Sequence, residues 1–163
     1  MRSSVYRHVV ICFESIFTPL TVQFVHDCHS RKSALQHAAQ IIHQERKSID
    51  PRELLGKLTE REELGCTVID DTKVALPHCR FDECLTPIGA ILRFVPEVSF
   101  GNAGAVALAF ALVVPPETDE THLQILKTIA VVCTNPDQLS QLLEVRGPLN
   151  LRATFLRYAR QMD

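Results

Sequence analysis

The chain has 163 residues, of which 46% are hydrophobic and 22% charged, a composition that fits one globular domain and excludes a disordered or collagen-like chain. Its 17 basic and 19 acidic residues give a formal net charge of −2, so it lacks the positive field that holds a nucleic acid backbone. No apolar run reaches the roughly 18 residues of a membrane span. We therefore expect neither a nucleic-acid partner nor membrane insertion.

The N-terminal segment, residues 1–17, has little periodic pattern, and we expect it to form an arm preceding a domain of residues 18–163. It resembles a secretory signal only faintly, because Glu14 interrupts the apolar run and no clean cleavage site follows. The six cysteines are scattered without paired spacing, which favours reduced thiols and a cytoplasmic location.

Two helices dominate the first half of the expected domain. After a short strand over 21–25, apolar residues at helical spacing predict a helix over about 33–46. A second helix over 51–64 has Asp50 as its N-terminal cap. We expect Gly65 to end this helix in a left-handed conformation.

Strands and then helices follow in the second half. Strands are expected over 74–76 and 88–95, and the almost wholly apolar run 106–114 is typical of a strand buried on both faces. Three helices, separated by proline-containing breaks, are then predicted over 121–133, 136–145 and 149–161. Helices on both sides of such strands indicate an α/β sandwich.

Arg61 is the first candidate functional residue. It lies seven residues after Leu54 and three after Leu58, on the helix stripe that we expect to face inward. The spacing alone favours a packed stem whose charged head reaches outward near the helix end. The alternative is a guanidinium that binds an anion such as phosphate.

His122 is the second candidate. The sequence Thr121-His-Leu-Gln124 fits a capping box, which places His122 in the first turn of the helix that follows the buried strand. Ligands of open α/β sheets bind at the carboxyl ends of strands, and a helix N-terminus favours anions. A neutral imidazole here can donate a hydrogen bond to a phosphoryl oxygen. A partly buried structural histidine is the alternative.

His78 is the third candidate. It follows a strand and Pro77, which stiffens the backbone and can hold the ring in one orientation. Imidazole is a good nucleophile near neutral pH when a neighbour keeps one ring nitrogen protonated. An ordinary loop histidine is the alternative.

Other motifs carry less information. His26, Cys28 and His29 resemble a metal-binding cluster but lack a distant second pair of ligands, so metal binding is the weakest hypothesis. The sequence has no glycine-rich phosphate loop, no Gly-x-Ser-x-Gly elbow and no His-Glu-x-x-His pair. Nucleotide hydrolysis, serine hydrolysis and zinc proteolysis therefore lack support.

The order of these pieces along the chain resembles a known family. The stretches concerned are Arg61-Glu-Glu-Leu-Gly65-Cys66-Thr67, Ala75-Leu-Pro-His78, Phe110-Ala-Leu-Val-Val-Pro115 and Thr121-His122-Leu123. Together they resemble the enzyme IIA domain of the phosphoenolpyruvate-dependent phosphotransferase system, in its fructose/mannitol class, and most of all the nitrogen-regulatory IIA proteins. The resemblance extends over about residues 18–160.

This resemblance implies a mixed β-sheet flanked by helices and a bacterial, cytoplasmic phosphocarrier. In that family the histidine of the Pro-His motif accepts a phosphoryl group from an HPr-like phosphohistidine donor, and the matching residue is His78. The other motifs imply that His122 stabilises the phosphoryl group and that Arg61 binds it. Transfer between two imidazoles needs positioning and charge stabilisation, so no metal or other cofactor is expected.

The leading interpretation is a phosphotransferase-type carrier that regulates target proteins by its phosphorylation state, and a homodimer is compatible with it. Two alternatives stay open. The chain departs from the glycine-rich sequence of the family at Cys79 and in the stretch 68–74, which contains Asp70 and Asp71. This departure favours the first alternative, a divergent interaction module with little or no transfer. The second alternative is a sugar-specific component, for fructose or mannitol, that passes phosphate to a IIB domain.

Overall fold

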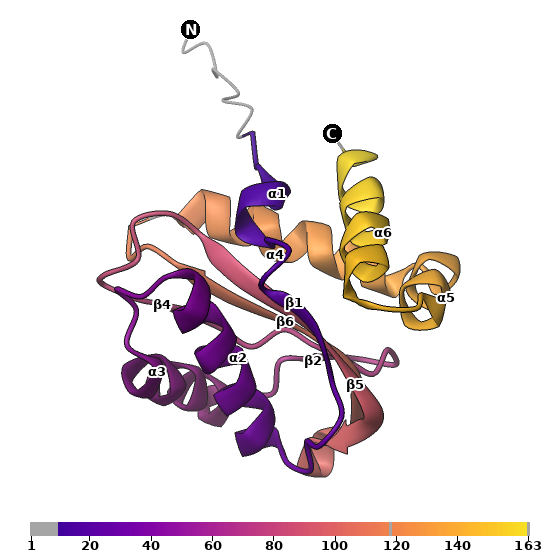
Figure 1. Ribbon diagram of the computed structural model, residues 1–163, viewed down its shortest axis with the longest axis horizontal. Helices are drawn as coiled ribbons and strands as arrows, with labels where there is room; N and C mark the ends of the chain where they lie inside the picture. Colours follow the sequence, from indigo (N-terminus) through magenta and orange to yellow (C-terminus); the bar gives the residue numbers. More distant parts are fainter. Residues whose placement is uncertain (1–9, 118, 163) are drawn as a thin grey trace, which may run out of the picture.

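Six helices and six strands make up the described residues, 10–117 and 119–162, of the computed structural model (Figure 1). In chain order they are α1 (Phe13–Ile16), β1 (Val22–Val25), α2 (Arg31–Glu45), α3 (Pro51–Leu64), β2 (Val68–Ile69), β3 (Val74–Ala75), β4 (His78–Arg80), β5 (Ile88–Ser99), β6 (Ala105–Val114), α4 (Asp119–Thr134), α5 (Pro136–Glu144) and α6 (Pro148–Arg160), with a short 3-10 turn (Gly101–Ala103) between β5 and β6. None of these helices is long and apolar enough to cross a bilayer.

The strands form one mixed sheet in the order β1-β5-β6-β3-β2. β5 and β6 pair antiparallel, while β1 runs parallel to β5 and β3 runs parallel to β6. β4 follows β3 along the same edge of β6, also in parallel, and this pairing sets His78 opposite Leu112. The sheet thus holds the start of β4 at the carboxyl end of its central strand.

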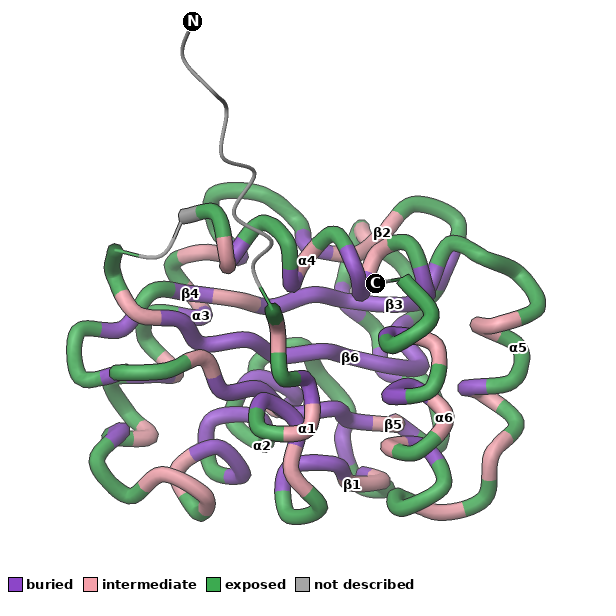
Figure 2. The backbone as a smooth tube through the Cα atoms, turned by 90° about the horizontal axis from the view of Figure 1, so that it is seen from above, coloured by how far each residue is buried: buried purple, intermediate pink, exposed green. Residues whose placement is uncertain are grey.

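Helices cover both faces of the sheet, as predicted (Figure 1). Ala109 and Ala111 of β6 face the core beneath α2 and α3, whereas Leu108 and Phe110 face the core shared with α1, α4 and α6. Figure 2 shows β6 as a continuous buried stretch between the two layers. The expected strand with two buried faces is therefore confirmed, because its side chains alternate between two cores.

The helix ends agree with the sequence signals in most places. Asp50 caps α3, its Oδ2 accepting a hydrogen bond from the Glu53 amide at 2.9 Å. Gly65 follows the last helical residue as expected, but its φ of 161° is extended backbone, so the left-handed conformation was wrong. α4 begins at Asp119, so Thr121 lies inside the helix and does not cap it.

The strands differ more from the prediction. The strand expected to end at residue 95 continues to Ser99, because Val98 and Ser99 resume the pairing with β6 after a shift in register. β2 and β4 were not predicted, since two or three residues are too few to show alternation.

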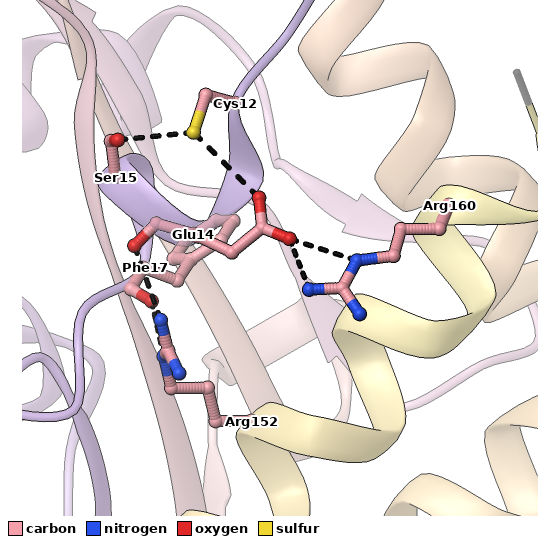
Figure 3. A network of polar contacts seen from close by, with 6 residues as sticks. All are labelled: Cys12, Glu14, Ser15, Phe17, Arg152 and Arg160. Carbon is pink, nitrogen blue, oxygen red and sulfur yellow. Dashed lines mark hydrogen bonds and ion pairs between the residues drawn. The ribbon is translucent and has the colours of Figure 1, made fainter.

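α1 is part of the core, although the segment 1–17 was expected to be an arm. The rings of Phe13 and Phe17 meet the ring of Phe155 edge-on, with centroids 5.8 and 5.5 Å apart. Arginines of α6 also bind α1 and the residue after it through hydrogen bonds and an ion pair (Figure 3). The remainder of the expected arm, residues 1–9, lies outside the described residues.

Candidate active site

The two histidines singled out from the sequence lie side by side. The ring centroids of His78 and His122 are 5.3 Å apart, and the rings are nearly perpendicular at 83°. β4 pairs with the last residues of β6, and α4 begins soon after β6 ends. The carboxyl end of the central strand therefore brings the two rings together, at the edge where α/β sheets place their ligands.

A pocket of about 310 Å³ opens beside these rings. It is lined by residues of α3, β4 and the start of α4: Lys57, Glu60, Arg61, Leu64, His78, Cys79, Arg80 and His122. α3 packs directly against β4 (Figure 2), and Arg61 of α3 lines the same pocket as the two histidines. The three candidate residues thus converge on one pocket, whose lysine and two arginines outnumber its single glutamate and suit an anion.

The backbone determines which nitrogen of His78 is available for reaction. Its Nδ1 lies 2.6 Å from the carbonyl oxygen of Leu76. A carbonyl can only accept a hydrogen bond, so Nδ1 carries the proton of the neutral ring and Nε2 keeps its lone pair. Such a ring is a nucleophile through Nε2.

The surroundings of His78 favour its neutral form. Burial is the largest cause that lowers the pKa of His78 below its usual value, and the guanidinium of Arg61 lowers it further. The hydrogen bond to Leu76 and the carboxylate of Glu62 act in the opposite direction, without cancelling the shift. The ring is therefore uncharged and nucleophilic near neutral pH.

Arg61 and His122 occupy different environments around the pocket. Arg61 is half-buried, and its Nη1 donates a 3.0 Å hydrogen bond to the carbonyl of Gly65 at the end of α3. Its head thus reaches the helix end, as the spacing favoured, and also lines the pocket. The imidazole of His122 is only 8% exposed and stands at the first turn of α4.

Glu62 is a buried carboxylate beside the site that the sequence analysis missed. It is 5% exposed, and Leu54 and Leu58 are the other buried residues of α3. The signal was present, because residues four and eight positions after Leu54 lie on the same helix face. The Thr67 hydroxyl donates a hydrogen bond to Glu62 Oε1.

The stretch 68–74 lies away from the histidines. Asp70 and Asp71 line a separate pocket of about 720 Å³, between the β2–β3 turn and the turn that precedes β6. Asp71 and Lys73 adopt left-handed backbone with φ of 63° and 57°, so this turn forms without glycine. The acidic residues that departed from the family pattern therefore do not line the candidate pocket.

Cys79 packs in the core beneath α2 and α3, and its position on β4 explains why. Successive residues of a strand point to opposite sides, so the ring of His78 faces the pocket, whereas Cys79, which also borders the pocket, packs in that core. Burial raises the pKa of the Cys79 thiol to about 12. It is therefore not a thiolate nucleophile at neutral pH.

The proposed metal cluster does not form. Cys28 is buried, with its thiol 3.7 Å from the Ser30 carbonyl, whereas His26 and His29 are exposed. Among the described residues no group of three histidine, cysteine or acidic side chains could hold a metal ion. The metal-binding hypothesis therefore has no geometric support.

Comparison with known proteins gives a consistent result. The family model described as phosphoenolpyruvate-dependent sugar phosphotransferase system, EIIA 2, matches residues 15–157. A nitrogen regulatory protein of Pseudomonas aeruginosa is 34% identical over 110 residues, which are 66% of this chain and 71% of the relative. For a nitrogen regulatory protein of Escherichia coli the identity is 29% over 106 residues, 63% of this chain and 64% of that relative.

Solved structures agree with the sequence matches. The crystal structure of nitrogen regulatory protein IIA-Ntr from Neisseria meningitidis superposes with a TM-score of 0.80 at 25% identity, covering 88% of this chain and 98% of that chain. Mannitol IIA of Escherichia coli gives a TM-score of 0.64 at 14% identity over 90% of this chain and 99% of its own, a similarity of fold alone.

Proposed function

Because the chain belongs to the EIIA 2 family of the phosphoenolpyruvate-dependent sugar phosphotransferase system, we propose that it is a phosphocarrier whose His78 accepts a phosphoryl group. The observation that carries this proposal is the convergence of His78, His122 and Arg61 on one pocket. A nucleophilic imidazole, a second imidazole and a guanidinium are the groups that phosphoryl transfer between histidines needs.

The transfer follows from the protonation state of His78. The lone pair of Nε2 forms a bond to phosphorus while the N–P bond of the donor's phosphohistidine breaks and its electron pair returns to the donor ring. The Nδ1 proton stays on His78, where the Leu76 carbonyl stabilises the positive charge that the ring acquires. His122 and Arg61 stabilise the phosphoryl oxygens during the transfer.

We propose an HPr-like phosphohistidine protein as the donor and a regulatory role for the product. The proposal of regulation rests on the relatives named nitrogen regulatory proteins, which cover a range of bacteria. In this role the phosphorylation state of His78 changes which target proteins bind. A cytoplasmic location agrees with the six free thiols, since cytoplasmic proteins keep their cysteines reduced.

Labelling with a phosphorylated donor tests the proposal. The purified chain is mixed with an HPr-type protein carrying labelled phosphohistidine, and acid-labile phosphate on the chain is measured over time. We expect label on the parent and on His37→Ala, which alters an exposed histidine of α2, and none on His78→Ala. A parent without label, or His78→Ala labelled as well as the parent, would exclude the carrier function.

A further inference from the structure

Behind the candidate site, a chain of hydrogen bonds joins Glu62 to His78. The Thr67 hydroxyl donates to Glu62 Oε1, and the Thr67 carbonyl accepts from the Leu76 amide at 3.0 Å. The Leu76 carbonyl in turn accepts from His78 Nδ1 at 2.6 Å. The end of α3 is thereby connected to the reactive ring through the backbone that follows β3.

This chain of hydrogen bonds is shielded from water. Glu62 is 5% exposed, and Thr67 and Leu76 are each 8% exposed, so bulk water cannot replace a bond that is lost. Glu62 Oε2 is buried and has no hydrogen-bond partner within the described residues. A buried carboxylate with one oxygen unsatisfied destabilises a fold, so its presence calls for an explanation, and a role at the neighbouring site is one.

We propose that Glu62 and Thr67 are positioning residues that hold the Leu76 carbonyl against His78 and thereby keep the proton on Nδ1. The importance of this for phosphoryl transfer rests on the proposed function, whereas the tautomer itself is a property of the free protein. A neutral histidine has two tautomers, and only the one protonated on Nδ1 has a lone pair on Nε2.

The geometry explains why the hydroxyl of Thr67 matters for a ring that it does not touch. Thr67 lies just before the short strand β2, and its carbonyl binds the Leu76 amide. The position of that carbonyl therefore depends on how firmly the rest of Thr67 is fixed. Without the bond to Glu62, the Thr67 peptide and the Leu76 peptide that binds it can shift together. A shift lengthens the bond from Nδ1 to the Leu76 carbonyl, and the tautomer protonated on Nε2 becomes populated. The carboxylate of Glu62 also acts on His78 through its charge, which supports their proximity.

Nitrogen NMR of histidine-labelled protein measures this directly, because the shifts of the two ring nitrogens differ between tautomers. We expect the parent to be protonated on Nδ1 of His78. In Thr67→Val, which keeps the shape and removes the hydroxyl, we expect the ratio of the Nδ1-protonated to the Nε2-protonated tautomer to fall at least tenfold. The rate of phosphoryl transfer should fall in proportion to the fraction of rings that remain protonated on Nδ1. Thr67→Ser, which restores a hydroxyl, should recover both.

Thr128→Val is the matched control. Thr128 is also buried, at 4% exposure, but its hydroxyl donates to the Gln124 carbonyl of its own helix at 3.0 Å. We expect this variant to keep the parent's tautomer ratio. If Thr67→Val does not fold, Glu62→Gln takes its place: it keeps the size and an acceptor oxygen but is a weaker acceptor, and we expect a two- to threefold fall in the ratio.

Several results would overturn the inference. They are protonation of His78 on Nε2 in the parent, an unchanged ratio in the folded variants of Thr67 and Glu62, or an equal change in Thr128→Val. These outcomes are distinct from failure of the proposed function. If the parent takes no label, the proposed function fails, but the tautomer can still be measured. If the parent is labelled and its tautomer ratio does not change in the Thr67 variant, only the present inference fails.

Discussion

Replacing Arg61 by alanine separates catalysis from stability at the candidate site. The guanidinium of Arg61, one of two in the pocket, can pair with two phosphoryl oxygens at once, and it lines the pocket together with the two imidazoles. Removing one preorganised donor to developing charge costs about 2.7–4 kcal/mol of transition-state stabilisation. We therefore expect the transfer rate to His78 to fall by about 10²–10³.

The effect on stability should be small by comparison. Arg61 is half-buried and donates one described hydrogen bond, to Gly65, so its loss costs about 0.5–1.5 kcal/mol of unfolding free energy. For a chain of this size that lowers Tm by about 1–6 °C. Arg61→Lys, which keeps the charge but not the paired geometry, should lie between the parent and the alanine variant in rate.

The assay combines single-turnover labelling from a phosphorylated donor with a thermal unfolding curve for each variant. Arg52→Ala is the control, because Arg52 lies on the same helix, is exposed and does not line the pocket. The reasoning is refuted if Arg61→Ala transfers at the parent's rate. It is also refuted if the loss of unfolding free energy equals the loss of transition-state stabilisation, since Arg61 would then be a structural residue.

Three further predictions concern pH and packing. Since the pKa of His78 lies below its usual 6.5, more than half of the rings are neutral at pH 6.5, and the transfer rate should fall to half of its plateau only at a lower pH; a half-maximal rate above pH 6.5 would contradict the lowered pKa. A Cβ at Gly89 would lie 2.5 Å from Phe17 Cε1 and 2.7 Å from the Ala111 carbonyl oxygen, so Gly89→Ala should cost about 1–3 kcal/mol in urea unfolding, and an unchanged midpoint would disprove the clash. The pair with Arg160 is the main cause that lowers the pKa of Glu14 below 4.5, so its contribution is present above that pH and is lost as the pH falls through the lowered value. Glu14→Gln should therefore reduce stability at pH 7 by less than about 1 kcal/mol, a difference that vanishes in acid and that a pH series of unfolding curves would reveal.

Much of the fold was predictable because its signals are local. The apolar run of β6 predicts a strand buried on both faces, and Asp50 with Pro51 marks the start of α3. The failures have local causes as well. β2 and β4 are too short to show a period, and α1 is a single turn whose phenylalanines gain their burial from α6, far along the chain.

The site was predictable only in pieces. His78, His122 and Arg61 each had an ordinary structural explanation, and the order of the motifs was what joined them. Glu62 escaped notice because a glutamate among charged neighbours is usually solvated, and its partner Thr67 follows in a segment without regular structure.

The amino-acid sequence by itself determined the succession of the longer helices and strands, since helical and strand periods are properties of contiguous residues. Only the tertiary structure decided that an arginine of α3 and histidines of β4 and α4 share one pocket, because that depends on the parallel pairing of β4 with the end of β6. It also decided the reactive nitrogen, through the direction in which one backbone carbonyl points.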